Sequence, residues 1–315
     1  MSAAAPYAGL SPDLVLDAIA AVGLRPDGRL LALNSYENRV YQAGLEDGGF
    51  VVAKFYRPAR WSDAAIDEEH AFARELAEAE IPVVAPLVFA GRSLLAHAGF
   101  RYALYPRRGG RAPTLESREH LEWMGRLIAR IHTVGARAPF RHRGALDRAT
   151  FVAAPMQAVL ASPLLPARLG EAYRAAGARL DAAIAARYAA VGPLRTLRLH
   201  GDCHPGNVLW TDAGPHFVDL DDARMGPAVQ DLWMLAADAA AMDALLDGYA
   251  QFRDFDPAEL ALVPALRAMR QLHYAGWIAA RWADPAFPTA FPFVAEARWW
   301  EQHVADLGEA ADALD

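Results

Sequence analysis

Strand-type and helix-type segments occupy different parts of this chain, and that separation constrains the fold more than any other feature of the sequence. In the first third, short runs rich in β-branched and aromatic residues are separated by turn sequences, a pattern typical of antiparallel hairpins. Further along, apolar residues recur at spacings of three and four, as in amphipathic helices. The chain therefore predicts an α+β fold with a small antiparallel β lobe and a mostly helical large lobe. The first three strand-type runs are Leu30–Leu33, Arg39–Ala43 and Phe50–Tyr56.

Capping signals place helices around the strands of the first third. Ser11, followed by a proline and an acidic first turn, predicts a helix that runs to about Leu24. Ser62 predicts a second helix that runs to about Ala79, followed by two further strands within Ile81–Tyr105. The predicted small lobe is thus an antiparallel sheet with one helix between its strands.

A Pro/Gly-rich connector, Pro106–Gly110, follows the last of these strands and predicts a hinge between two lobes of one domain. We assign residues 1–105 to the N-terminal lobe and residues 106–315 to the C-terminal lobe. The C-terminal lobe is predicted to be helical apart from three short strands, and helical throughout after Pro227. These strands are Leu197–Leu199, Val208–Trp210 and Phe217–Leu220.

Charge and cysteine content exclude several classes of function. The chain has 31 basic and 38 acidic residues, a net charge of −7, so its long-range field repels nucleic acid and anionic membranes. Its single cysteine, Cys203, rules out an intrachain disulfide. The first 24 residues contain no Lys or Arg, unlike a signal peptide, and no 18-residue window is free of charge and proline. We expect a cytoplasmic protein that binds neither nucleic acid nor membrane.

Lysine occurs once, at Lys54, whereas the other 30 basic residues are arginine. Arginine can replace lysine where the charge is solvated, but not where a compact ammonium must reach between phosphate groups. Lys54, inside the third predicted strand, is therefore a candidate for phosphate binding. Chance placement of a single lysine is the alternative interpretation.

The strongest chemical signal is the octapeptide His200–Asn207, which is followed by a second acidic cluster, Asp219–Asp222. Two glycines and a proline prevent the octapeptide from forming a helix. A loop that carries Asp202 and Asn207, next to a strand that ends in Asp219, places three oxygen ligands around one cleft. Mg²⁺ prefers such ligands when phosphates and water complete its coordination, so the segment predicts phosphoryl transfer.

The octapeptide has two other interpretations, a zinc site and a simple turn. His200 and His204 flank Cys203 and could suggest zinc, but the loop lacks the helix that would align the histidines, and no second cysteine exists. Asp and Asn are also common turn formers. The carboxylates at Asp219–Asp222 disfavour simple turn chemistry, because they repel one another unless a cation neutralises them. No Walker A, G-x-G-x-x-G, G-x-S-x-G or H-E-x-x-H motif occurs.

The pattern His-Gly-Asp-x-His-x-x-Asn that begins at His200, with Asp219 downstream, resembles the catalytic signature of the aminoglycoside phosphotransferase and choline kinase group, relatives of the protein kinases. Longer strings resemble the bacterial stress response kinase A family, which phosphorylates protein Ser/Thr. The similarity covers nearly the whole chain. It implies a protein-kinase-like two-lobed fold, with ATP bound by the N-terminal lobe and catalysis and acceptor binding in the C-terminal lobe. The longer strings are Leu33–Tyr41, Lys54–Pro58, Phe217–Leu235 and Arg281–Pro288.

The resemblance implies a role for each matching residue. Asp202 becomes the catalytic base for the acceptor hydroxyl, and Asp219, also catalytic, holds Mg²⁺ together with Asn207. Lys54 would contact the α- and β-phosphates of ATP and pair with Glu69 on the second predicted helix.

The segment Asn34–Asn38 contains no glycine, although kinases usually carry a Gly-rich loop at this place. The resemblance implies that backbone amides and the Ser35 hydroxyl hold the phosphates instead. Glu68 is the alternative partner for Lys54. Asp231 is expected to accept backbone amides of the catalytic loop, with a simple helix N-terminal acid as the alternative.

We therefore expect an ATP- and Mg²⁺-dependent protein serine/threonine kinase of the bacterial stress response, itself a phosphoprotein and a monomer, with protein substrates. Two other hypotheses stay open. A small-molecule hydroxyl kinase of the choline or aminoglycoside type would share the same catalytic residues. A non-catalytic nucleotide-binding scaffold would have no need of the base Asp202.

Overall fold

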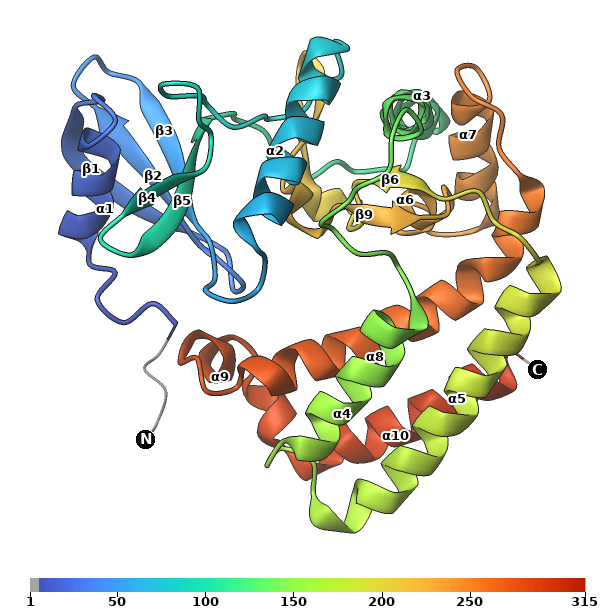
Figure 1. Cartoon of the computed structure of the whole chain (residues 1–315). Coiled ribbons are helices and arrows are strands. Elements are labelled where there is room, and N and C mark those ends of the chain that lie inside the picture. The colour runs from blue at the N-terminus through green and yellow to red at the C-terminus, as the bar shows by residue number, and fades with distance from the viewer. Residues whose placement is uncertain (1–5, 315) are drawn as a thin grey trace.

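A five-stranded antiparallel sheet forms the small lobe in the computed structural model, which describes residues 6–314 (Figure 1). The strand order is β1-β2-β3-β5-β4, so β3 is central and pairs with β2 and β5. Residues 1–5, part of the stretch on which the expected absence of an export signal rests, lie outside the described residues. The elements of this lobe are α1 (Pro12–Ala20), β1 (Pro26–Leu33), β2 (Arg39–Leu45), β3 (Phe50–Phe55), α2 (Asp63–Glu78), β4 (Leu95–His97) and β5 (Phe100–Pro106).

Side chains of β3 alternate between the two faces of the sheet, because successive strand residues point to opposite sides. Val51, Ala53 and Phe55 are buried in a cluster with the apolar face of α1. Lys54 belongs to the opposite face and is flanked in register by β2 and β5. The central strand therefore fixes the backbone of the lysine from both sides.

Helix α2 connects the sheet to the large lobe. It begins after Ser62, whose side chain accepts a hydrogen bond from the backbone N–H of Ala65 at 3.2 Å, as the sequence predicted. Ile66 packs against side chains of the sheet. Phe72 and Leu76 belong to the apolar cluster built by α3 and α7. Figure 1 shows α2 between the sheet and α3.

The large lobe has two helical parts, and the first is built around α3 and α7. These helices pack so closely that a Cβ atom at Gly125 or Gly248 would collide with the backbone of the other helix. The two small sheets β6-β9 and β7-β8 lie in this part, and the loops beside them carry His200–Asn207 and Asp219. Its elements are α3 (Arg118–Gly135), β6 (Leu197–Leu199), β7 (Val208–Thr211), β8 (Gly214–Phe217), β9 (Arg224–Gly226), α6 (Gln230–Trp233) and α7 (Ala239–Tyr249).

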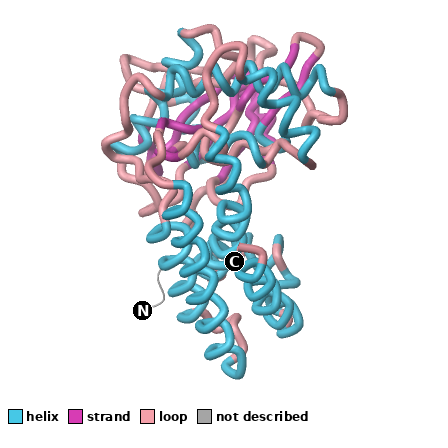
Figure 2. Tube along the Cα trace, turned by 90° about the vertical axis from the view of Figure 1, so that its right-hand side faces the viewer, coloured by secondary structure: helices cyan, strands magenta, loops and turns pink. Residues whose placement is uncertain are grey.

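Four helices, α4, α5, α8 and α10, form the second part, which extends away from the strands (Figure 2). Tyr173, Leu272 and Trp300 are buried in their shared core. Within residues 6–314, no helix combines the length and apolar character needed to span a membrane. The elements are α4 (Ala154–Ala161), α5 (Gly170–Val191), α8 (Val263–Arg281), α9 (Ala286–Ala290) and α10 (Ala297–Asp312).

Two boundaries predicted in the small lobe were wrong. The first helix ends at Ala20 and not near Leu24, and Gly23, with φ of 90°, turns the chain toward β1. The two strands predicted to follow the second helix are present as β4 and β5, but they begin at Leu95 and not at Ile81. The preceding stretch contains Pro82 and Pro86, which lack the N–H group that strand pairing requires.

The strand expected at Phe217–Leu220 was also wrong, since β8 ends at Phe217. Asp219 adopts the left-handed conformation, with φ of 59° and ψ of 64°, and a 3-10 turn covers Leu220–Asp222. A strand requires extended backbone angles, so the positive φ ends it. The acidic cluster is therefore presented by a turn.

Candidate active site

A cavity of about 910 Å³ is lined by side chains of both lobes. The small lobe contributes the loop after β1, the strand β3 and the helix α2, and the large lobe contributes the octapeptide and the turn after β8. The structure brings every site residue predicted from the sequence to this cavity. They are Ser35, Lys54, Glu69, Asp202, Asn207 and Asp219.

Lys54 provides a buried positive charge in this cavity. Its Nζ lies 2.9 Å from Oδ1 of Asp219 and 3.3 Å from Oδ1 of Asp221, and the residue is 6% exposed. Burial disfavours the charge, but Asp219, Asp221 and Glu69 outweigh it and raise the pKa of Lys54 well above its ordinary value. Lys54 is therefore protonated, as phosphate binding requires.

Glu69 lies on α2 within the same cavity, but in this structure the expected ion pair with Lys54 is not formed, because the ammonium bonds to the two aspartates. Glu69 is 2% exposed, and its Oε2 has no hydrogen-bond partner. Burial raises the pKa of Glu69 to about 7, although Lys54 opposes the shift. The alternative residue, Glu68, instead accepts backbone N–H groups of residues 141–143.

Asp231, on α6, holds the first residues of the octapeptide. Its Oδ2 accepts the backbone N–H of His200 and its Oδ1 that of Gly201, both at 2.8 Å, and Nε2 of His132 lies 3.1 Å from Oδ2. Gly201 has a φ of 86°, and a Cβ there would collide with the backbone carbonyl of Asp222. The expectation that Asp231 accepts amides of the catalytic loop is confirmed.

Asp202, the predicted base, is held from two sides. Nη1 of Arg270 lies 2.5 Å from its Oδ1, and Nε2 of His204 lies 3.5 Å from its Oδ2. Burial alone would raise the pKa of Asp202, but the hydrogen bond from His204 and the charge of Arg270 outweigh it and lower the pKa below its usual range. Asp202 is therefore ionised at neutral pH. The sequence analysis did not single out Arg270.

Asn207 and Asp219 fit a magnesium ion. Nδ2 of Asn207 donates to the backbone carbonyl of Asp202 at 2.9 Å, and no residue in 6–314 donates to its Oδ1, which is free to act as a ligand. The Asp219 side chain is 52% exposed, and Lys54 engages its Oδ1. A Mg²⁺ ion needs only a few oxygen ligands from the protein when phosphates and water complete its coordination shell, and one amide oxygen and one carboxylate meet that need.

The side chains considered for zinc do not converge on one point. Nε2 of His200 lies 2.9 Å from the carbonyl oxygen of Val218, whereas His204 faces Asp202. Cys203 is buried among apolar side chains, and burial raises the pKa of its thiol. These contacts make the two histidines groups that order the loop.

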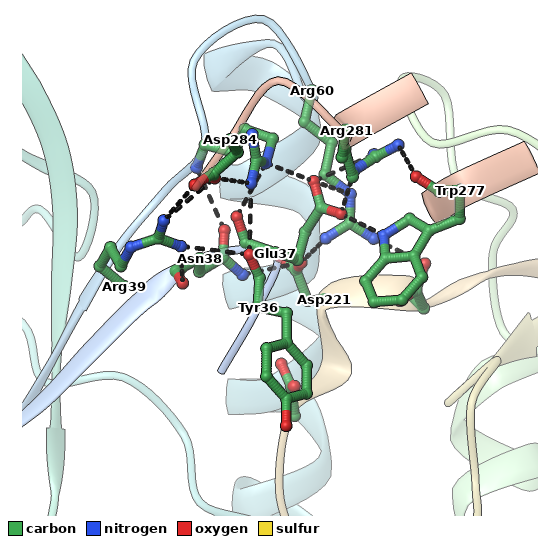
Figure 3. A network of polar contacts seen from close by, with 12 residues as sticks. Tyr36, Glu37, Asn38, Arg39, Arg60, Asp221, Trp277, Arg281 and Asp284 are labelled. Carbon is green, nitrogen blue, oxygen red and sulfur yellow. Dashed lines mark hydrogen bonds and ion pairs between the residues drawn. The ribbon is translucent and has the colours of Figure 1, made fainter. Parts of the chain in front are cut away.

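Side chains fasten the glycine-free loop Asn34–Asn38 to its surroundings (Figure 3). Nδ2 of Asn38 donates to Oδ2 of Asp221 at 3.0 Å, and Oδ1 of Asn38 accepts the backbone N–H of Arg57 at 3.1 Å. Ser35 lies at the cavity wall. The loop therefore has a defined conformation before any phosphate binds.

Glu37 and Asp284 join this loop to the C-terminal part of the chain. The Glu37 carboxylate lies 3.0 Å from Nε of Arg57, 2.5 Å from Nε of Arg281 and 2.5 Å from Nε1 of Trp277. Asp284 accepts a hydrogen bond from Nη2 of Arg57 at 2.6 Å. Figure 3 shows these groups converging from both lobes on one polar network. Each charge in it has an opposite partner, which a buried ionic cluster requires.

Arg60 and Asp221 also line the cavity, although the sequence pattern gave no role to Arg60 and placed Asp221 only within the acidic cluster. Nη1 of Arg60 contacts Oδ2 of Asp221, and its Nη2 lies 2.8 Å from Oδ1 of Asp222. Burial opposes ionisation, but Arg60 and Lys54 lower the pKa of Asp221 to about 2. A signal was present, because all four strings that carry the family resemblance contribute residues to this network. They are Leu33–Tyr41, Lys54–Pro58, Phe217–Leu235 and Arg281–Pro288.

A buried lysine on the central strand, an ionised aspartate on a glycine-containing loop and a pair of oxygen ligands between two lobes define a phosphotransferase of the kinase type. The profile of the phosphotransferase enzyme family matches residues 29–263. Stress response kinase A of Escherichia coli (strain K12) is 44% identical over 310 residues, which cover 97% of this chain and 94% of that protein. The serine/threonine protein kinase RdoA of Salmonella typhimurium is 43% identical with the same coverage. The chain belongs to the stress response kinase A family, within the phosphotransferase enzyme family.

Solved structures share the fold. Amicoumacin kinase hAmiN, in complex with AMP-PNP, Ca²⁺ and Ami, has a TM-score of 0.72 and 20% identity, with coverage of 93% of this chain and 92% of that one. A microcompartment-associated aminopropanol kinase has a TM-score of 0.65 and 16% identity, with coverage of 93% and 98%. The predicted kinase-like two-lobed fold is confirmed.

Proposed function

We propose that this kinase uses ATP and Mg²⁺ to phosphorylate serine or threonine hydroxyls of protein substrates. The observation that carries the proposal is the single cavity in which Lys54, Asp202, Asn207 and Asp219 meet. Together they offer a cation for phosphates, ligands for a metal and a base for a hydroxyl, the parts that phosphoryl transfer requires. The neighbour amicoumacin kinase, whose structure holds AMP-PNP and Ca²⁺, supports a nucleotide and a divalent cation as ligands.

Asp202 would orient the acceptor hydroxyl and accept its proton as the hydroxyl oxygen bonds to the γ-phosphorus. The bond between that phosphorus and the oxygen bridging it to the β-phosphate breaks, and ADP leaves. The lowered pKa of Asp202 keeps it ionised for this task. Arg270 engages Oδ1 closely, at 2.5 Å, whereas His204 stays 3.5 Å from Oδ2. Oδ2 is therefore the oxygen better placed to meet the acceptor.

Lys54 would exchange its bond to Asp219 for bonds to the α- and β-phosphates. Glu69, buried in the same cavity with Oε2 unpartnered, would then balance the ammonium. A bound Mg²⁺, held by Asn207 and Asp219, supplies neutralisation of phosphate charge. Ser35 and the backbone of its loop would contact the phosphates.

Two relatives support a protein as the acceptor of the phosphoryl group. They are 43–44% identical over 97% of this chain, and one is named a serine/threonine protein kinase. A role in the stress response, a cytoplasmic location and a monomeric state belong to the same proposal. Autophosphorylation on serine or threonine belongs to the same proposal.

The test is transfer from γ-labelled ATP in the presence of Mg²⁺. The purified protein is offered an unstructured serine-rich protein in one set of reactions, and choline, an amino alcohol or an aminoglycoside in the other. We expect label on serine or threonine of the added protein and of the kinase itself. The matched variant Asp202→Asn should bind nucleotide normally but transfer roughly 10² to 10⁴ times more slowly.

Two outcomes would replace the proposal. Rapid labelling of a small hydroxyl compound without any labelled protein would make this a small-molecule kinase. Nucleotide binding without transfer to any acceptor would make it a scaffold.

A further inference from the structure

A second hollow, of about 450 Å³, opens beside the active-site cavity between α6, α8 and α10. We call it the side groove and define it by Trp233, Arg267, Arg270, Tyr274 and Trp299. Arg270 and Tyr274 also line the active-site cavity, so the two hollows are neighbours that share these two side chains. Arg270, which lines the side groove, also bonds to the predicted base Asp202. A peptide segment bound in the side groove would therefore lie close to Asp202.

The side groove is lined by two arginines, Arg267 and Arg270, and by one carboxylate, Asp306, in a chain whose net charge is −7. Arg267 and Arg270 are three residues apart on α8 and therefore share one face of the helix. Arg270 bonds to Asp202, whereas Arg267 forms no ion pair with any residue in 6–314 and lies 5.7 Å from the centroid of the Trp233 ring. The one carboxylate on the groove, Asp306, already accepts a hydrogen bond from Gln302.

The wall of the side groove is fixed to the catalytic loop. Nε1 of Trp233 donates to Oε1 of Gln230 at 3.1 Å. Nε2 of Gln230 in turn donates to the carbonyl oxygen of Gly201, also at 3.1 Å. Because Gly201 directly precedes Asp202, the position of the groove relative to the base is set by hydrogen bonds.

We propose that the side groove binds the acceptor segment of a protein substrate, and that Arg267 selects a carboxylate side chain on that segment. This inference rests on the proposed protein kinase function. Arg267 is one helical turn from Arg270, about 4.5 Å along the axis, which corresponds to roughly one to two residues of an extended peptide. The preferred substrate is therefore an acidic segment with Glu or Asp within about two residues of the acceptor serine or threonine.

The preference for an acidic segment depends on the charge of Arg267 at contact distance and not on the net charge of the whole chain. The acidic chain as a whole attracts basic partners, but that field decays within about 8–10 Å at physiological ionic strength. At contact distance the planar guanidinium of Arg267 matches a carboxylate in two parallel hydrogen bonds. Trp233 and Trp299 offer apolar surface for the aliphatic part of the same segment.

Direct binding tests the groove independently of catalysis. Three fluorescein-labelled peptides carry alanine at the acceptor position and differ only in the residues about two positions away on each side, which are Glu, Gln or Lys. Fluorescence anisotropy on the full-length kinase should give a dissociation constant about tenfold lower for the Glu peptide than for the Lys peptide. Arg267→Gln should abolish the difference, and Arg267→Glu should reverse it. Arg137→Gln, an exposed arginine away from both hollows, should preserve it.

Equal binding of the three peptides by the wild type, or a preference that survives in Arg267→Gln, would overturn the inference. Serine versions of the same peptides, incubated with labelled ATP, separate it from the proposed function. Equal labelling of all three would leave the protein kinase function standing and remove the groove's selectivity. If binding depends on Arg267 but none of the serine peptides is labelled, the selectivity of the side groove stands and the proposed protein kinase function falls.

Discussion

Arg39, which begins β2, and Asp284, which follows α8, bond to each other across the two lobes: Nη2 of Arg39 lies 2.8 and 3.0 Å from the two carboxylate oxygens of Asp284. Asp284 is 3% exposed and is also bonded by Arg57. The loop Asn34–Asn38 directly precedes Arg39. The position of this loop therefore depends on a residue near the other end of the chain.

Asp284→Ala should lower both stability and nucleotide affinity. The change leaves Arg39 and Arg57 facing a buried space without their carboxylate, which typically costs about 3 kcal/mol of unfolding free energy. Urea unfolding and nucleotide titration measure the two effects. The exposed control Asp254→Ala should change the unfolding free energy by no more than about 0.5 kcal/mol. Unaltered nucleotide affinity in Asp284→Ala would show that the loop holds its position without the lobe contact.

Asp231→Asn should loosen the catalytic loop while leaving nucleotide binding intact. The amide retains one acceptor oxygen, so it cannot accept both the His200 and Gly201 N–H groups that the carboxylate accepts. We expect faster hydrogen exchange at these two amides and a transfer rate at least about tenfold lower. Protected amides together with slow transfer would contradict the positioning role of Asp231.

Lys54→Arg should impair transfer about as severely as Lys54→Met. The buried ammonium bonds to Asp219 and Asp221 from one compact point, a geometry that a broader planar guanidinium does not reproduce. Transfer rates and circular dichroism of both variants provide the comparison. An active arginine variant would mean that the single lysine of this chain occurs at its position by chance.

Asp219→Ala should remove the dependence of nucleotide affinity on Mg²⁺. Asn207 alone offers one neutral oxygen, which is a weak magnesium site without a carboxylate. Titrating nucleotide with Mg²⁺ and then with a chelator measures the gain in affinity due to the ion. We expect a clear gain in the wild type and none in the variant. A gain of wild-type size would locate the metal elsewhere.

Glu69→Gln should change how stability depends on pH. The pKa of Glu69 is about 7 in the folded protein and about 4.3 in an unfolded chain, so between these values the folded state retains a proton that the unfolded state has lost. This residue therefore contributes less stability as pH rises from about 4.3 to 7, and no further change occurs above that range. Glutamine does not titrate, so the unfolding free energy of Glu69→Gln does not decrease for this reason.

Urea unfolding at about pH 5 and pH 8 measures the effect. The stability of Glu69→Gln relative to the wild type should rise between the two values, on the order of 2 kcal/mol. Glu116→Gln, an exposed site, is the matched control. A constant difference across this range would mean that Glu69 is already ionised in the folded protein.

Local sequence signals were sufficient for much of the fold. The Ser62 cap, the strand that contains Lys54 and the helical spacing of apolar residues after Gly110 depend on interactions within a few residues of the chain, and the structure confirms each. The presence of Asp202 and Asn207 in one cavity was predictable for a related reason, since the two residues lie five positions apart in one short loop. The left-handed Asp219 was not predictable, because a strand and a turn have similar apolar patterns over so few residues.

The sequence by itself determined the α+β architecture, the central strand that carries Lys54 and the residues that gather around the active-site cavity. Only the tertiary structure decided which carboxylates Lys54 bonds to, that Arg270 holds Asp202, and that Glu37 and Asp284 fix the glycine-free loop. These contacts join residues up to 245 positions apart. Such pairs carry no local signature, because packing of the whole chain brings them together and burial then makes each charge depend on its partner.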